Sequence, residues 1–212
     1  MIPLSSKSLN TALFGIGLAV IVGCADAESD LRLHPVEHYR IQYEQTGMMT
    51  GTVERGCRNW CAEQVEITDT TMSMMGITQK TRTRAVTVRD KIYNINLENG
   101  KATVTTNPMY DMIVQQIENS GNDPKQVGEA WLNAMGFSST GNERTIAGET
   151  CIDYSGMGGV ATSCMTEDGL MLRTEAMGMV QTATAVDRSG GGSSADYEIP
   201  ADAQSIQIPG TN

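Results

Sequence analysis

Residues 107–136 read NPMYDMIVQQIENSGNDPKQVGEAWLNAMG, and this stretch decides the fold because it interrupts a long series of strand-like segments. Apolar side chains recur at helical spacing over 109–119 and again over 125–135. Asp123 suits an N-cap and Gly136 suits a helix stop. The stretch therefore predicts one or two helices inserted in the middle of a β-rich chain.

On both sides of this stretch the sequence reads as strands. Polar and apolar residues alternate from Tyr39 onward, and Asn99-Gly100 is a strong hairpin signal. In order, we expect strands at 39–43, 50–56, 61–68, 70–76, 81–89, 92–97, 101–106, 170–178, 179–187 and 197–199. The run of small residues over 190–194 predicts a flexible loop. The expected fold class is α+β and β-rich, because a long antiparallel sheet can bury one face against the inserted helices.

The composition limits the classes of function. The chain has 212 residues, 40% of them hydrophobic, which at ~100–200 residues per domain fits one domain and a leader. The formal net charge of −10 argues against nucleic-acid binding, which requires clustered Lys and Arg. The sequence contains neither the glycine motifs of nucleotide sites nor a convincing nucleophile–base pair, so we expect no enzyme and no cofactor.

The N-terminus resembles an export signal. The apolar run at 11–22 is too short to span ~30 Å of hydrocarbon and is typical of a signal-peptide core. It ends at Ile21-Val22-Gly23-Cys24, which resembles the lipobox of bacterial lipoproteins. We therefore expect Cys24 to be lipidated. Ala25-Asp26-Ala27 is a competing, ordinary cleavage site that would release a soluble protein.

These signals divide the chain into a signal peptide at 1–23, a tether at 24–37 and a domain at 38–208. If Cys24 is the mature N-terminus, Asp26 is third in the mature chain rather than second. By resemblance to enterobacterial sorting, this places the anchor in the inner leaflet of the outer membrane, facing the periplasm.

Four cysteines follow the leader, and export favours disulfide bonds. Folding the chain at the turn signals between them brings Cys57 opposite Cys61 and Cys151 opposite Cys164. We therefore predict two disulfides, each joining the two strands of one hairpin. The spacings C-x3-C and C-x12-C differ from the C-x-x-C of redox and zinc sites.

Several short motifs resemble periplasmic domains of the LolA/LolB-like superfamily. They are YEQTGMMTGT at 43–52, IAGETCIDY at 146–154, DGLMLR at 168–173 and YEIPA at 197–201. The resemblance covers roughly 39–208 in order and looks closest to an uncharacterised branch, with Tyr197 in place of the usual Phe and Asp202 in place of the usual Gly. It implies a half-open antiparallel β-barrel wrapped around one or two helices. In such folds the concave face holds an acyl chain or another apolar ligand.

Methionine is enriched, with 14 residues against 2 phenylalanines. Flexible thioethers suit a cavity that accepts varied acyl chains, and they equally suit core filling in an aromatic-poor protein. The expected apolar lining of the ligand site comes from strands and helices: Met72, Met74, Ile113, Trp131, Met165, Met171, Met177 and Met179. Folding the chain at Asp168 places Met165 opposite Met171.

Metal binding is a minority interpretation. Thioethers bind Cu(I), and Met-x-Met occurs at 72–74 and 177–179, but no His–Met cluster accompanies either. His34 and His38 lie four residues apart, which suits a metal only on a helix, and a solvated linker is the simpler interpretation. We therefore expect no metal site.

The sequence thus predicts a non-catalytic envelope lipoprotein that binds an apolar or acyl-chain ligand on the concave face of a curved sheet. Its expected partners are that lipid and the membrane that holds the anchor, with an envelope protein as a further candidate. Two alternatives stay open: a structural or protein-interaction lipoprotein whose cavity is filled by its own helices, and a Met-rich periplasmic Cu(I)-binding protein. Residual cavity volume would argue against the first, and three converging methionine sulfurs would favour the second.

Overall fold

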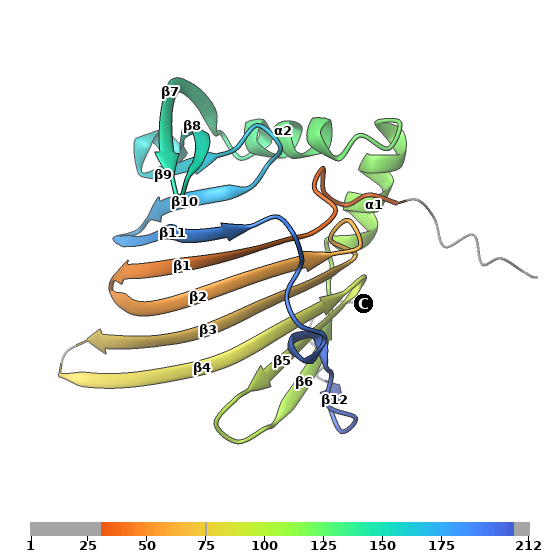
Figure 1. Ribbon diagram of the computed structural model, residues 1–212, viewed down its shortest axis with the longest axis vertical. Helices are drawn as coiled ribbons and strands as arrows, with labels where there is room; N and C mark the ends of the chain where they lie inside the picture. The colour runs from red at the N-terminus through yellow and green to blue at the C-terminus, as the bar shows by residue number, and fades with distance from the viewer. Residues whose placement is uncertain (1–30, 75, 206–212) are drawn as a thin grey trace, which may run out of the picture.

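The computed structural model describes residues 31–74 and 76–205, in which one twelve-stranded sheet forms the centre of the fold. The strand order is β12-β6-β5-β4-β3-β2-β1-β11-β10-β9-β8-β7. Neighbouring strands are antiparallel, except that β12 lies parallel to β6. Sheet accounts for 53% of the structure, and the sheet is curved but does not close (Figure 1). The predicted α+β, half-open architecture is confirmed.

The first half of the sheet is a six-stranded meander. Each strand pairs with the next: β1 (Tyr39–Gly47), β2 (Met49–Arg58), β3 (Glu63–Met74), β4 (Ile77–Val88), β5 (Lys91–Asn96) and β6 (Ala102–Thr106). The separate strands expected at 61–68 and 70–76 form the single strand β3. No Gly or Pro interrupts this segment, and its β-branched threonines favour a continuous strand.

The second half is another meander, which follows the helices. Its strands are β7 (Ser138–Ile146), β8 (Glu149–Gly156), β9 (Ala161–Met165), β10 (Met171–Ala176) and β11 (Met179–Asp187). Pairing of β11 with β1 joins the two meanders into one sheet. Little in the sequence indicates β7, because SSTGNERTI is polar and its side chains are almost all exposed.

The predicted helices are confirmed as α1 (Tyr110–Asn119) and α2 (Pro124–Ala134). Asp123 caps α2 as expected, since its carboxylate accepts hydrogen bonds from the backbone amides of Lys125 and Gln126. The helices lie beside the β8–β9 part of the sheet, and α2 runs past the ends of these strands (Figure 1).

The expected strand at 197–199 is wrong. Its first residue ends a short 3-10 helix, η2 (Ser194–Tyr197), which Ser193 and Asp196 begin with a reciprocal capping box. The loop expected to be flexible at 190–194 packs closely instead, and the Tyr197 hydroxyl donates to the Gly191 carbonyl at 2.7 Å. A two-residue strand, β12 (Gln204–Ser205), ends the described chain.

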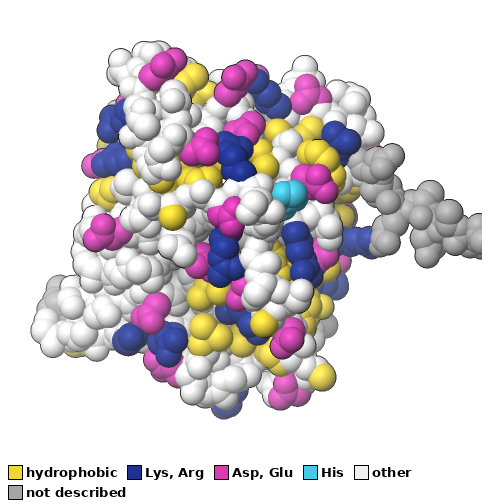
Figure 2. Space-filling model, in the orientation of Figure 1, with side chains coloured by type: hydrophobic (Ala, Val, Ile, Leu, Met, Phe, Trp, Pro, Cys, Tyr) yellow, Lys and Arg dark blue, Asp and Glu magenta, His cyan; other side chains and the backbone are white. Residues whose placement is uncertain are grey.

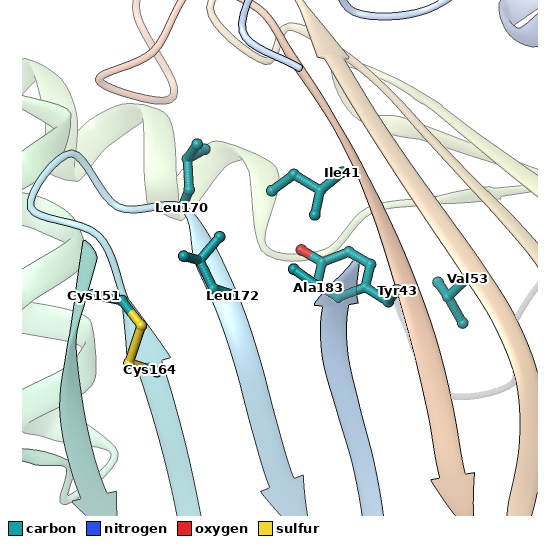
Figure 3. Packing of buried hydrophobic residues seen from close by; sticks show 8 residues of the cluster. All are labelled: Ile41, Tyr43, Val53, Cys151, Cys164, Leu170, Leu172 and Ala183. Atoms are coloured by element: carbon teal, nitrogen blue, oxygen red, sulfur yellow. A yellow bond between two sulfur atoms is a disulfide. The ribbon is translucent and has the colours of Figure 1, made fainter. Parts of the chain in front are cut away.

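Two hydrophobic clusters stabilise the sheet. The first brings together side chains of both meanders: Ile41, Tyr43, Val53, Cys151, Cys164, Leu170, Leu172 and Ala183 (Figure 3). The second lies between the first meander and the C-terminal segment: Val65, Val86, Ile95, Ala102 and Tyr197. The C-terminal segment therefore covers a part of the sheet that the helices do not reach.

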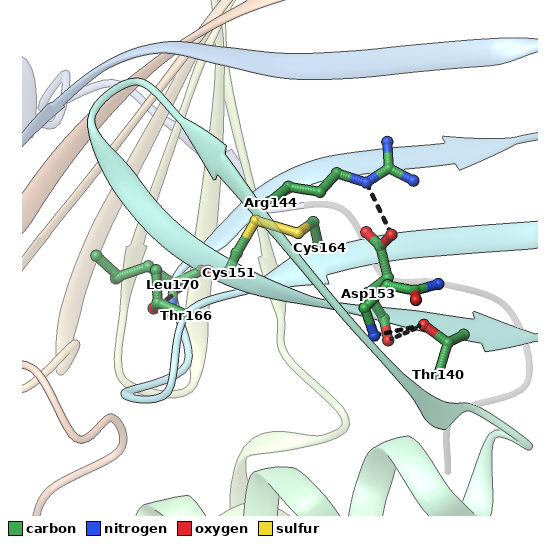
Figure 4. Close-up of a disulfide and its surroundings, with 8 residues drawn as sticks. Thr140, Arg144, Cys151, Asp153, Cys164, Thr166 and Leu170 are labelled. Atoms are coloured by element: carbon green, nitrogen blue, oxygen red, sulfur yellow. Dashed lines mark hydrogen bonds and ion pairs between the residues drawn. A yellow bond between two sulfur atoms is a disulfide. The ribbon is translucent and has the colours of Figure 1, made fainter.

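The cysteines pair as predicted, with sulfur–sulfur distances of 1.95 Å for Cys57–Cys61 and 2.09 Å for Cys151–Cys164 (Figure 4). The predicted registers are wrong. Cys164 lies opposite Asp153, so its bond to Cys151 runs diagonally, because the β8–β9 turn begins one residue later than the glycines suggested. Cys61 lies in the β2–β3 turn, not on a strand opposite Cys57.

The N-terminal segment 31–37 lies against the sheet, so the prediction of a solvated linker is wrong for these residues. The Leu33 amide donates to the Trp60 carbonyl at 3.0 Å, and the Trp60 amide donates to Glu37 at 2.9 Å. The Arg32 guanidinium lies 4.0 Å from the centre of the Trp60 ring. The contacts come from the β2–β3 turn, far away in the sequence. Cys24, the signal peptide and 206–208 lie outside the described residues.

Candidate functional site

A cavity of about 540 Å³ lies between the two helices, strands β8 and β9, and the N-terminal segment. Its apolar lining is contributed by Leu33, Pro35, Met109, Ile113, Ile117, Val127, Trp131, Leu132, Ile152 and Met165. Ligand pockets typically measure ~300–1,000 Å³ and are mostly apolar. The cavity therefore has the size and lining of a small-molecule site.

The helices form one wall of the cavity. Ile117 of α1 and Val127 of α2 are buried, and the Trp131 indole N–H donates to the Gln116 side chain at 2.6 Å, which ties the helices together. Gly128 also lines the cavity, and a Cβ built on it would meet no atom within 4 Å. This wall therefore leaves open space where a larger side chain would fit.

Strands β8 and β9 form the opposite wall. Ile152 and Tyr154 alternate along β8, and Ile152 lies directly opposite Met165 of β9. Side chains of directly opposed residues point to the same face of a sheet. The period of two along the strands thus places these side chains on the face toward the helices.

The third wall is the N-terminal segment, with His34 at its centre. Its Nδ1 accepts a hydrogen bond from the Val36 amide at 3.1 Å, and its ring centre lies 5.3 Å from that of Tyr39. Burial lowers the pKa of the His34 imidazole, against smaller opposing effects of Gly169 and Asp168. His34 therefore favours the neutral form in this wall.

Charged side chains lie at the rim. Lys125 pairs with Glu167 at 3.4 Å, and Arg188 pairs with Glu149 at 2.9 Å and with Asp168 at 2.6 Å. Burial opposes the ionisation of Asp168, but hydrogen bonds from Arg188 and Thr166 outweigh it and lower its pKa. A more polar hollow of about 850 Å³ adjoins the cavity here. The site is thus apolar inside and charged at its opening.

Three of the eight predicted lining residues contribute to the cavity: Ile113, Trp131 and Met165. Met171 lies opposite Met165 as predicted but does not line the cavity. Met72, Met177 and Met179 lie at the far ends of their hairpins, and the Met177 side chain is 76% exposed. Met74 ends β3, and its side chain is outside the description. Residues that share one face of a strand do not all line the cavity, because the helices cover only one end of that face.

Sequence reasoning missed the walls formed by β8 and by the N-terminal segment. The alternation of Ile152 and Tyr154 was a usable signal for a half-buried strand. Leu33 and Pro35 gave none, because a short stretch before the first strand has no periodicity.

Beyond the cavity, one level of the same sheet face is polar. One row of directly opposed residues crosses the sheet from β8 to β4: Tyr154, Ser163, Thr174, Gln181, Gln45, Gly51, Thr70 and Thr81. The side-chain amide of Gln181 donates to Gln45 at 2.7 Å. At this level of the sheet the apolar site therefore does not continue from β8 and β9 toward β4.

Among the described residues, no group of three His, Cys, Asp or Glu is placed to hold a metal ion. Two methionines, Met109 and Met165, line the cavity. In the same part of the chain, no helix is long and apolar enough to span a bilayer.

The comparison with known proteins gives structural similarity without a family. No family model and no curated protein matches the sequence. An uncharacterised conserved protein from Thermus thermophilus has 8% identity and a TM-score of 0.47, over 80% of this chain and 89% of its own. LprF from Mycobacterium bovis has 12% identity and a TM-score of 0.36, over 74% and 87%. MucB has 12% identity and a TM-score of 0.30, over 86% and 66%.

These identities and scores do not assign the chain to a family. The half-open sheet that the LolA/LolB-like resemblance implies is confirmed by the structure itself, whereas membership of that superfamily stays a prediction.

Proposed function

We propose that this protein binds an acyl chain or another apolar ligand in the cavity between its helices and β8–β9, without catalysis. The observation that carries the proposal is an apolar cavity of about 540 Å³ with a charged opening. Each buried methylene would contribute ~0.8 kcal/mol to binding. The charged rim would leave a polar head group in water, so amphipathic ligands fit as well.

The volume of the cavity also bears on the alternatives. A structural lipoprotein with a self-filled interior would leave little space between sheet and helices, so the cavity favours ligand binding. A Cu(I) site needs several converging thioethers, and the two methionines of the cavity give that alternative little support. A lipoprotein that acts by binding another protein stays the alternative.

Gly128 allows a test in which the cavity is filled without removing a contact. Gly128→Leu places a side chain in open space, whereas Gly128→Ala adds only a methyl group. Both changes should favour α2, because Gly is ~1 kcal/mol worse than Ala inside a helix. We would titrate a fluorescent fatty acid into the chain that begins at Glu28, and record native mass spectra after purification without detergent.

The expected result is that the wild type and Gly128→Ala bind the fatty acid and Gly128→Leu binds it at least tenfold more weakly. Equal binding by all three, or binding by none, would contradict the proposal. Met72→Asp serves as a control with an added charge outside the cavity, and should leave the affinity unchanged.

We also propose that Cys24 is lipidated and that the protein faces the periplasm from the outer membrane. The basis is the sequence Ile21-Val22-Gly23-Cys24 at the end of the apolar run. Labelling of growing cells with a radioactive fatty acid should mark the wild type and not Cys24→Ser, and an unlabelled wild type would argue against the anchor.

A further inference from the structure

The turns of the sheet differ sharply in charge between the two ends of the strands. We call the end with the turns at Met48, Gly76, 157–160 and 177–178 the methionine end. The register brings these turns together, since Gly47 pairs with Met179, Met49 with Met72, and Ala161 with both Gly156 and Ala176. Three of the turns project at the left of Figure 1.

The methionine end carries no charge. Each of its hairpins has an uninterrupted uncharged stretch, at 45–53, 70–79, 154–166 and 176–186. These 43 residues would carry about eight charges at the chain's average of 19%, and they hold nine of its 14 methionines. At the lower left of Figure 2, the end of the β3–β4 hairpin shows no charged side chain outside the grey atoms. The β5–β6 turn, farther along the curved sheet, carries Glu98 and Lys101 and is not included.

The opposite end, which we call the charged end, contrasts with it. Its turns and their flanks hold Arg58, Glu63, Arg89, Asp90, Lys91, Glu149, Glu167, Asp168, Asp187 and Arg188. The turns of the charged end therefore hold charged residues, whereas the four turns of the methionine end hold none. A general need for soluble hairpin turns does not explain this difference, because it would apply equally to both ends.

The methionine end is also where apolar side chains are most exposed. Among the described residues, the five most exposed large hydrophobic side chains all lie there: Met177 at 76%, Ile77 at 71%, Val160 at 69%, and Met48 and Met157 at 56% each. Clustered exposed apolar side chains mark interaction sites more often than isolated ones do.

Two of these methionines occupy backbone positions that do not favour them. Met157 and Met177 have φ of 53° and 52°, in the left-handed region, where Asn or Gly costs less. Met177-Gly178 forms a two-residue hairpin turn, for which Asn-Gly is the preferred sequence. A bulky apolar residue at such a position indicates that its side chain is needed for something other than the turn.

From these observations we infer that the methionine end docks onto the surface of a lipid bilayer, with its turns inserted among the head groups and upper acyl chains. Insertion requires removing no charge from water, which is the main cost for a protein segment entering a membrane. Association of this kind scales with the apolar area buried. The turns contain no cation and the chain is acidic, so an uncharged bilayer fits better than an anionic one.

The shape of this end favours a bilayer over a protein partner. Four separate turns project, and specific protein interfaces rely on a polar rim with hydrogen bonds and on complementary charge. The methionine end offers no charge for such recognition. A bilayer needs no matching surface, and flexible methionine side chains adapt to it.

The docking surface is separate from the cavity and from the N-terminal tether. The segment 31–37 leaves the fold at the charged end, beside Trp60. An anchor at Cys24 would hold the charged end close to its membrane, so docking of the methionine end is tested on a chain without the anchor.

The test uses the mature chain, 24–212, carrying Cys24→Ser, so that an introduced cysteine is the only free thiol. An environment-sensitive fluorophore is attached to Met48→Cys at the methionine end or to Ala147→Cys at the charged end. Phosphatidylcholine vesicles are added, with and without lipids that carry a quencher on the acyl chain. We expect a blue shift and quenching at position 48 and neither at position 147.

A matched pair of variants separates docking from folding. Met157→Asn together with Met177→Asn replaces apolar side chains by turn-favouring ones, so the thermal midpoint should stay or rise. The vesicle concentration for the half-maximal shift at position 48 should increase at least tenfold. Ala147→Asn makes the same kind of change at φ 51° in the Ala147-Gly148 turn of the charged end, and should leave that concentration unchanged.

Three outcomes would overturn the inference. The probe at position 48 could stay in water with vesicles present, or the probe at position 147 could be the one that enters the bilayer. A shift at position 48 that grows with protein concentration in the absence of vesicles would instead assign this end to contacts between two copies of the chain.

Discussion

At the scale of single residues, His34 connects the N-terminal segment to the cavity. Its unprotonated Nδ1 accepts the Val36 amide, and its ring is packed against Tyr39. Protonation would remove the acceptor and place a charge in a half-buried position. The conformation of this wall therefore depends on the neutral form of one side chain.

The lowered pKa of His34 leads to a pH dependence with a definite sign. The unfolded chain takes up a proton near the ordinary pKa of 6.5, and the folded chain only at lower pH. The contribution of His34 to the free energy of unfolding should thus be constant above about pH 6.5 and decrease as the pH falls below that value. Urea unfolding at pH 7.5 and 5.0 measures the difference.

His34→Gln is the control for this prediction, because it keeps a polar side chain that does not titrate. It should reduce the loss of stability between pH 7.5 and 5.0. Carboxylates with a lowered pKa, such as Asp168, change the free energy of unfolding only near and below their ordinary pKa of 3.8. Their effect therefore lies outside the range from pH 7.5 to 5.0. An equal loss in the variant would show that other groups cause the dependence.

At the scale of elements, the two short helices that form one wall of the cavity contain few buried residues. The buried side chains of α1 and α2 are Ile117 and Val127, one in each helix. Helices of ten and eleven residues are marginal by themselves, so caps and tertiary packing must hold them in place. The two helices, which form one wall of the cavity, are thus able to move away from it.

The cap at Asp123 should therefore matter for both stability and binding. Asp123→Ala removes the acceptor for two backbone amides, at 3.0 Å and 3.3 Å, and should cost about 1 kcal/mol. We expect faster amide hydrogen exchange in α2 and weaker binding of the fatty acid. Asp123→Asn preserves the cap and should behave like the wild type, and a similar loss in both variants would point to the charge instead.

At the scale of the whole molecule, the sheet has two cores covered by different segments. The first cluster joins β1 and β2 to β8–β11, and Val36 of the N-terminal segment packs against it, while the C-terminal segment covers the second cluster. Arg40 holds this segment through an ion pair to Asp196 at 2.7 Å, and the Arg58 guanidinium lies 3.9 Å from the centre of the Tyr197 ring. The open sheet is thus stabilised separately at its two halves.

Removing Tyr197 should loosen one half more than the other. Tyr197→Ala deletes a side chain that is 5% exposed and should lower the free energy of unfolding by about 3 kcal/mol. Hydrogen exchange should accelerate in β4–β6 and much less in β8–β10. Tyr197→Phe loses only the bond to Gly191 and should cost about 1 kcal/mol. Uniform acceleration over all strands would contradict two separately covered cores.

Much of the element order could be predicted because it depends on neighbours in the sequence. The helical spacing over 109–119, the cap at Asp123 and the Asn99-Gly100 turn are all local signals. Both disulfide pairs also followed from short spacings. Their registers did not, because the start of a turn can shift by one residue without changing which cysteines can meet.

The sequence by itself determined the fold class, the helices, the disulfide pairs and the uncharged stretches around the methionines. Only the tertiary structure decided which side chains form the cavity, because Leu33, Ile113 and Met165 meet from segments with no local relation. It also separated two groups of methionines that the sequence placed in one site. Met165 faces the helices, whereas Met177 lies at a distant turn, because the pairing of strands fixes which end of the sheet a turn occupies.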